Sequence, residues 1–288
     1  MIEKKVLVKD IEVNYKVFGE GKPPSESVNE VKPLLVLHGW GSKSERWTKV
    51  AELLTQIPSE DSSELKLMQK GMQIIVPDLP GFGLTPEPST AWNLDNYVDF
   101  LYEFSEKVPE LGREFYLLGH SFGGSVAVKF TIKYNQKIKK LFLISAACVR
   151  KVKLSKKILY RLAKIAKVFS FIPGYALLRK AIYKFVLRKS DYPYVKEGIM
   201  KETYLKVVSE DLSWRMPFIK VPTVIVWGSK DTSTPLAEAQ IVNQKIRNSK
   251  LIVVPDAKHS LQLEVPEILA QKIAENIDGE LLSLKNIV

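Results

Sequence analysis

The chain has 288 residues, of which 45% are hydrophobic and 26% charged, and its formal net charge is +11. These values are typical of a soluble globular protein that is long enough for one large core, or for a core and a smaller lobe. The single cysteine, Cys148, excludes an internal disulfide, and no apolar run approaches the roughly 18 residues that a membrane span needs. No apolar run of the signal-peptide type follows the N-terminus, so we expect a cytoplasmic protein.

The positive charge is concentrated in one segment. Residues 150–215 contain 17 Lys and Arg against 5 Asp and Glu, and residues 115–190 contain no acidic residue. The excess of this segment accounts for the whole net charge, so it calls for a local explanation.

Short apolar runs alternate with helical patterns along most of the chain. Continuous apolar runs predict buried strands, alternation predicts half-buried ones, and a spacing of three and four predicts helices. The predicted strands are residues 6–8, 11–18, 34–37, 74–76, 115–118, 140–145, 223–227 and 251–254. The predicted helices are residues 45–56, 94–107, 125–134, 235–246 and 266–277. This alternation indicates an α/β fold with a parallel sheet and right-handed crossovers.

A Gly-His-Ser-Phe-Gly motif at residues 119–123 lies where a predicted strand turns directly into a helix. Such a turn holds its central residue, Ser121, in a strained conformation and leaves room only for small neighbours. The serine oxygen then lies at a helix N-terminus, where backbone N–H groups favour negative charge. The alternative is an ordinary serine N-cap, because serine caps helices routinely.

Together with His-Gly-Trp-Gly at residues 38–41 and Pro-Asp-Leu-Pro-Gly-Phe-Gly at residues 77–83, this motif resembles the α/β-hydrolase family over nearly the whole chain. The resemblance implies a mostly parallel eight-stranded sheet flanked by helices, with an inserted helical cap. It also implies a nucleophile, an acid and a histidine in that chain order, which here are Ser121, Asp231 and His259. Asp231 and His259 each follow a predicted strand, on the side where open α/β sheets bind their ligands.

The same resemblance implies an oxyanion hole formed by the backbone N–H groups of Phe122, the residue after the nucleophile, and of Trp40. His38, Gly39 and His120 are neighbours of this site and are candidates for substrate binding. We also consider that His38 braces the oxyanion loop, and that His120 is packed beneath the elbow.

Two other carboxylates compete with Asp231 for the role of the acid. Asp78 follows a strand as well, but its motif resembles a structural turn of the family. Asp256 lies three residues before His259 and is interpreted as a turn residue that caps local N–H groups.

The basic segment shows two amphipathic helical patterns, at residues 154–169 and 178–188, separated by Pro173-Gly174. We predict a helical cap at residues 148–215 on a core formed by residues 1–147 and 216–288. Its basic face is either simply solvated, or it contacts an anionic membrane or an amphiphilic substrate. No nucleic-acid motif accompanies the charge, so no nucleic-acid partner is expected.

We therefore predict a serine hydrolase that cleaves a carboxylic ester with a hydrophobic acyl group through an acyl-serine intermediate. The motifs do not separate this reaction from carbon–carbon bond hydrolysis of the meta-cleavage-product type, for which Arg150, Trp214 and Arg215 are candidates to bind a substrate carboxylate. A non-catalytic member of the fold that binds a ligand or partner is the third alternative. No cofactor loop and no metal-ligand spacing is visible, so neither a cofactor nor a metal is expected. The oligomeric state is not predicted.

Overall fold

The computed structural model describes residues 1–19, 32–56, 72–150 and 198–277. The centre of the fold is one eight-stranded sheet with the strand order β1-β2-β4-β3-β5-β6-β7-β8. Strand β2 runs antiparallel to its neighbours β1 and β4, and all the other neighbouring strands pair in parallel. The strands are β1 (Ile2–Val8), β2 (Ile11–Phe18), β3 (Leu34–Leu37), β4 (Ile74–Pro77), β5 (Phe115–His120), β6 (Ile138–Ile144), β7 (Thr223–Gly228) and β8 (Ser249–Val254). The predicted mostly parallel, eight-stranded α/β fold is confirmed.

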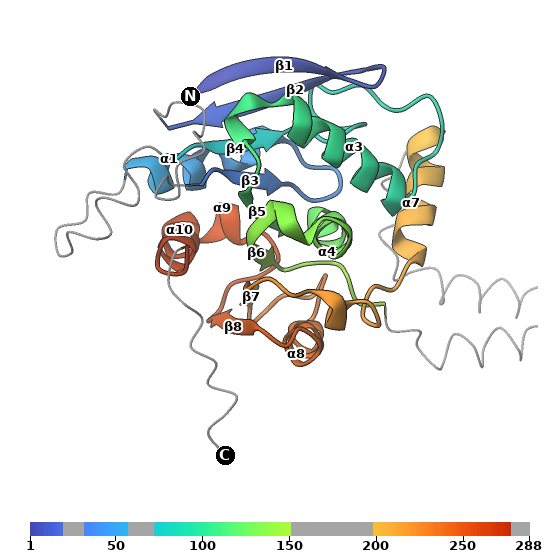
Figure 1. The fold of residues 1–288 in the computed structure, drawn as a ribbon. Coiled ribbons are helices and arrows are strands. Elements are labelled where there is room, and N and C mark those ends of the chain that lie inside the picture. Colours follow the sequence, from blue (N-terminus) through green and yellow to red (C-terminus); the bar gives the residue numbers. More distant parts are fainter. Residues whose placement is uncertain (20–31, 57–71, 151–197, 278–288) are drawn as a thin grey trace, which may run out of the picture.

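The central strands are apolar throughout because both faces of the sheet are covered. In β5, Leu117 packs into the core on one face, and the next residue, Leu118, packs into the core on the other. Figure 1 shows helices α3 (Leu94–Lys107), α4 (Phe122–Lys133) and α8 (Leu236–Lys245) on the first face. Helices α1 (Thr48–Gln56), α9 (Leu261–Glu264) and α10 (Pro266–Ala274) lie on the other.

The structure differs from the predicted elements mainly at their ends. Strand β1 begins at Ile2 and not at residue 6, because it is an edge strand whose exposed side chains give no hydrophobic pattern. The helix predicted from residue 45 starts as a 3₁₀ turn, Ser44–Trp47, before α1. Within the described ranges, the sequence patterns do not predict three further 3₁₀ turns, Pro109–Leu111, Asn135–Lys137 and Met216–Phe218.

Helix α7 (Ile199–Ser209) was also not predicted, and it belongs to the described end of the expected cap. It lies beside the start of α3 (Figure 1), where the backbone N–H of Trp92 donates a 3.0 Å hydrogen bond to Thr203 Oγ1. After α7, Glu210 accepts hydrogen bonds of 2.7 and 2.9 Å from Lys129 of α4. The two amphipathic helices predicted at residues 154–169 and 178–188 lie outside the described residues, so the division into core and cap stays a prediction.

Candidate active site

Ser121 lies at the turn between β5 and α4, in a backbone conformation that few residues adopt. Its φ is 52° and its ψ is −117°. A Cβ atom at Gly119 would come within 2.5 Å of the Gly123 carbonyl oxygen, and one at Gly123 within 2.4 Å of the Leu37 carbonyl oxygen. Only glycine fits at these two positions, so the motif is explained by close backbone approach around a strained serine.

The structure brings Ser121, His259 and Asp231 into one hydrogen-bonded chain. His259 Nε2 lies 3.0 Å from Ser121 Oγ, and His259 Nδ1 lies 2.8 Å from Asp231 Oδ2. The three residues follow the carboxyl ends of β5, β8 and β7. These ends lie along the same edge of the sheet because the consecutive strands β5, β6, β7 and β8 all pair in parallel. A carboxylate only accepts hydrogen bonds, so Nδ1 carries the proton and the lone pair of Nε2 faces the serine hydroxyl.

Asp231 is the buried end of this chain. Its side chain has no exposed surface, whereas 23% of the His259 side chain is exposed. Burial acts to raise the pKa of Asp231, but the hydrogen bond and charge of His259, with hydrogen bonds from Thr234, outweigh it and lower that pKa below its usual value. The carboxylate is therefore ionised where it can orient the imidazole.

The rings of His38 and His120 are buried and form hydrogen bonds with other groups of the protein. His38 is fully buried; its Nδ1–H donates to the Gly39 carbonyl at 2.8 Å, and its Nε2 accepts from the Leu79 N–H at 3.0 Å. His120 is 4% exposed and donates from Nε2 to the His259 carbonyl at 3.0 Å. Burial lowers the pKa of His38 to about 4 and that of His120 to about 3, so both are neutral. Both ring nitrogens of His38 are paired within the protein, and His120 Nδ1 is buried without a hydrogen-bond partner. Their substrate-binding role stays a prediction.

The loop after β3 has a geometry that bears on Trp40. The Gly39 carbonyl accepts hydrogen bonds from His38 Nδ1 at 2.8 Å and from the Ser42 N–H at 3.2 Å. Across a trans peptide the N–H points opposite to the carbonyl, so both bonds turn the Trp40 N–H the other way. This arrangement agrees with the interpretation of His38 as a brace. Gly39 itself lies against the elbow, since a Cβ there would come within 3.1 Å of the Ser121 Cβ.

The two competing carboxylates have other partners. Asp78 accepts hydrogen bonds from the Ser44 N–H at 2.6 Å and from the Leu84 N–H at 2.9 Å, which ties two loops together. Asp256 is exposed and pairs with Lys230 at 2.7 Å, so its carboxylate faces a cation and not the capped N–H groups that we expected. Of the three acids, the structure places Asp231 against His259.

Aromatic rings surround the elbow. The ring of Trp40 packs against the rings of Phe82, Phe122 and Tyr204, with centroids 4.9, 5.3 and 5.2 Å away. Tyr204 belongs to α7, so the described end of the expected cap lies next to the site. The Arg215 guanidinium lies 4.5 Å from the ring centroid of Trp214, which is 60% exposed.

Thr234 is a further residue of the site, and no sequence motif pointed to it. Its hydroxyl donates to Asp231 Oδ2 at 2.7 Å, and the N–H groups of Ser233 and Thr234 donate to Oδ1 at 2.8 and 2.9 Å. The available signal was Asp-Thr-Ser-Thr at residues 231–234, because an aspartate followed by hydroxyl residues is typical of such a turn.

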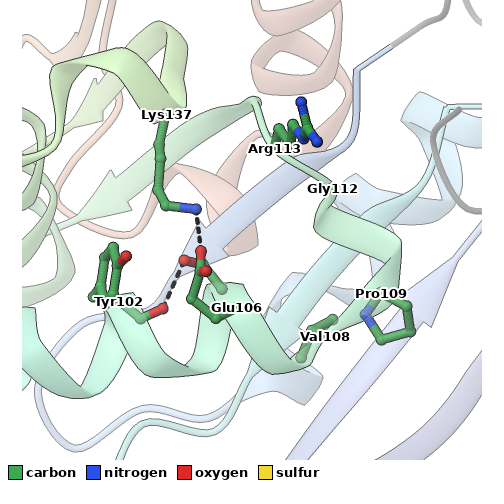
Figure 2. Close-up of a pocket in the computed structure, with 8 residues that line it drawn as sticks. Tyr102, Glu106, Val108, Pro109, Gly112, Arg113 and Lys137 are labelled. Carbon is green, nitrogen blue, oxygen red and sulfur yellow. Dashed lines mark hydrogen bonds and ion pairs between the residues drawn. The ribbon is translucent and has the colours of Figure 1, made fainter. Parts of the chain in front are cut away.

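A separate pocket of about 370 Å³ lies away from these residues, between the end of α3 and the start of β5. Figure 2 shows Lys137 paired with Glu106 in this pocket. The Ser105 hydroxyl donates to the Tyr102 carbonyl at 2.7 Å. The pocket offers no nucleophile next to a base. Within the described part of the chain, no cluster of His, Cys, Asp and Glu side chains could hold a metal ion, and no helix is long and apolar enough to cross a membrane.

The comparisons with known proteins agree with this fold. A model of the alpha/beta hydrolase family matches residues 34–272, so the chain belongs to this family. Lipase 3 of Moraxella sp. (strain TA144) is 24% identical over 264 residues, which cover 86% of this chain and 78% of that protein. Human monoacylglycerol lipase ABHD6 is 22% identical over 268 residues, which cover 84% and 74%.

Solved structures share the fold over nearly the whole chain. A meta-cleavage product hydrolase from Pseudomonas fluorescens IP01 has a TM-score of 0.64 and 19% identity, covering 94% of this chain and 96% of its own. A thermophilic esterase from Thermogutta terrifontis has a TM-score of 0.63 and 22% identity, covering 96% and 97%.

Proposed function

We propose that this protein is a serine hydrolase that cleaves a carboxylic ester with a hydrophobic acyl group. The observation that carries the proposal is the chain of two hydrogen bonds, 3.0 and 2.8 Å long, that joins Ser121 through His259 to the buried Asp231. In this proposal Ser121 is the nucleophile, His259 is the general base and then the general acid, and Asp231 orients the imidazole.

The reaction would proceed in two halves. His259 Nε2 takes the Ser121 proton as Oγ attacks the ester carbonyl, and the same proton then goes to the leaving alcohol as the C–O bond breaks. Water next gives a proton to Nε2 and attacks the acyl-Ser121 carbonyl, which releases the acid and restores the serine hydroxyl.

The N–H groups of Phe122 and Trp40 would hold the oxyanion in both halves. Phe122 is the first residue of α4, so its N–H has no acceptor within the helix. The orientation of the Gly39–Trp40 peptide supports the second donor. Each such donor is worth about 10²–10³ in rate.

An ester substrate is favoured over a carbon–carbon bond because several of the sequence relatives are named lipases or monoacylglycerol lipases. The aromatic cluster of Trp40, Phe82, Phe122 and Tyr204 is suited to an apolar acyl chain. The meta-cleavage product hydrolase shares the fold, and the same three residues would serve its type of reaction. It therefore remains the alternative activity to assay.

Fluorophosphonate labelling tests the catalytic proposal against a non-catalytic ligand-binding protein. We expect wild type and Ser209→Ala to be labelled equally and to hydrolyse p-nitrophenyl esters, because Ser209 is exposed on α7. Ser121→Ala should neither be labelled nor hydrolyse p-nitrophenyl esters. An unlabelled wild-type protein would refute the catalytic proposal, and labelling without ester hydrolysis would favour the alternative, carbon–carbon bond hydrolysis of the meta-cleavage-product type.

We further propose that the predicted cap contacts anionic membranes. The support is the charge of residues 150–215, with 17 basic and 5 acidic residues, and the exposed aromatic side chains of Trp214 and Phe218 beside Arg215. Lys and Arg near an anionic surface each contribute roughly 1 kcal/mol. In liposome flotation at low salt we expect recovery with anionic lipid and little with neutral lipid, and equal recovery would contradict the proposal.

A further inference from the structure

The Thr234 hydroxyl occupies a buried position between the members of the proposed catalytic chain. Its Oγ1 lies 2.7 Å from Asp231 Oδ2, 3.2 Å from the Ser145 carbonyl oxygen and 3.3 Å from His259 Nδ1. Thr234 is only 4% exposed. Because the side chain is buried, its hydroxyl cannot turn toward water and is held among these polar partners by hydrogen bonds.

The proton positions follow from what each partner can do. His259 Nδ1–H donates to Asp231, so Nδ1 has no lone pair to offer the threonine. The Thr234 proton then goes to Asp231 Oδ2, the shorter contact and a charge-assisted one. The threonine oxygen keeps lone pairs on the side of Nδ1–H, at 3.3 Å.

Asp231 therefore receives donors on both carboxylate oxygens. Oδ2 accepts from His259 and from the Thr234 hydroxyl, and Oδ1 accepts from the N–H groups of Ser233 and Thr234. The two backbone donors hold one oxygen, but only the hydroxyl holds the oxygen that faces the histidine. Loss of the hydroxyl would leave the angle of Oδ2 toward Nδ1 less constrained.

The backbone of Thr234 is held independently of its hydroxyl. The Thr234 carbonyl accepts a 2.7 Å hydrogen bond from Nε1 of the fully buried Trp227. The next residue, Pro235, restricts the chain further. A substitution that removes only the hydroxyl should therefore leave the loop in place.

We propose that Thr234 is a positioning residue: its hydroxyl fixes Asp231 Oδ2 and, through it, the orientation in which His259 Nε2 faces Ser121. This inference rests on the proposed hydrolase function. It assigns part of the rate to a side chain that touches neither the substrate nor the nucleophile.

The test compares Thr234→Val, which keeps the shape and removes the hydroxyl, with Thr234→Ser, which keeps the hydroxyl. We expect Thr234→Val to lower kcat for p-nitrophenyl butyrate about 10-fold to 100-fold with KM little changed, because the reacting groups are misaligned while substrate binding is not. Thr234→Ser should restore most of kcat. Thr232→Val, an exposed neighbour in the same loop, is the control and should behave as wild type.

A pH profile gives a readout that packing alone would not change. Without the hydrogen bond from the threonine hydroxyl, the negative charge on Asp231 is less stabilised. It then favours the protonated form of His259 more strongly in Thr234→Val than in wild type. The acidic limb of kcat/KM should then move to higher pH in Thr234→Val and return in Thr234→Ser. Thr234→Ala, which introduces no added bulk, takes the place of the valine variant if thermal unfolding shows that the latter is not folded.

Three results would overturn the inference. One is a folded Thr234→Val enzyme within about twofold of wild type. Another is an equal loss in Thr234→Ser, because that variant keeps the hydroxyl and the rate would then not depend on it. The third is an unchanged pH profile beside a reduced kcat. Fluorophosphonate labelling separates these from failure of the proposed function, because a wild-type protein that is not labelled at Ser121 refutes that function first.

Discussion

Replacement of Asp231 by asparagine tests the proposed mechanism most directly, because it exchanges one carboxylate oxygen for an NH₂ group and changes little volume. The position of Oδ1 accepts two backbone N–H groups, from Ser233 and Thr234, and only the amide oxygen of asparagine can replace it there. The asparagine NH₂ group must then take the position of Oδ2, which faces His259 Nδ1. Since NH₂ only donates, His259 is forced to the tautomer with the proton on Nε2.

The size of the effect follows from this change of tautomer. A proton on Nε2 points at Ser121 Oγ, 3.0 Å away, so the histidine cannot accept the serine proton. The same substitution in a serine protease triad lowers kcat about 10⁴-fold while the geometry stays intact. That loss corresponds to about 5 kcal/mol of transition-state stabilisation, and we expect Asp231→Asn to lose kcat by this order of magnitude.

The assay is initial-rate hydrolysis of p-nitrophenyl butyrate at pH 7.5, with thermal unfolding as the check on folding. Asp256→Asn is the matched control, because Asp256 lies three residues before His259 but is exposed and pairs with Lys230. Its positive φ of 60° is one that asparagine tolerates. A folded Asp231→Asn enzyme within tenfold of wild type would refute the assignment of the acid, and so would an equal loss in Asp256→Asn.

Two further predictions concern stability. His38 and His120 have pKa values of about 4 and about 3 in the fold, against 6.5 in the unfolded chain, so the unfolded state binds more protons below pH 6.5. The free energy of unfolding, measured in urea, should therefore fall as the pH drops from 6.5 toward 4. His120→Gln should make this fall smaller. If the fall with pH is the same in His120→Gln as in wild type, the burial of a neutral His120 is contradicted. Gly83→Ala should destabilise the fold by about 2 kcal/mol or more, because its φ is 57° and the new Cβ would come within 2.2 Å of the Asp78 carboxylate. Gly41→Ala, with φ 68° but open space around it, should lose only about 1 kcal/mol, and equal losses in denaturant titrations would show that the contact with Asp78 has no cost.

The buried strands were predictable from the sequence because they are apolar on both faces. Strand β3 was predicted with its observed bounds, and β5 and β7 lack only their polar or glycine ends. The edge strand β1 was predicted too short, because residues whose side chains are exposed carry no hydrophobic period. Helix α7 was not predicted, although its side chains Thr203 and Tyr204 contact the core beside the site.

The residues of the candidate site also fall into those that the sequence predicts and those whose surroundings only the structure shows. Ser121 could be predicted because a strained turn requires glycine at fixed positions around it, and these glycines form a recognisable motif in the adjacent sequence. His38 and His120 could be found as histidines near the motif, but their sequence positions do not say whether a ring faces a ligand or a carbonyl. Burial and the direction of two hydrogen bonds decide that, and both depend on segments that are distant in the chain.

The sequence by itself therefore determined the fold class, the turn that presents Ser121, and the order in which an acid and a histidine follow it. The fold class and the turn are local properties, set by hydrophobic period and by the steric limits of glycine and serine, whereas the order of the acid and the histidine is what the resemblance to the α/β-hydrolase family implies. Only the tertiary structure decided which carboxylate meets the histidine, since Asp78, Asp231 and Asp256 all follow strands or adjoin the motif residues. It also brought Thr234 next to His259, because a contact between residues 25 positions apart exists only after parallel strands bring their carboxyl ends together.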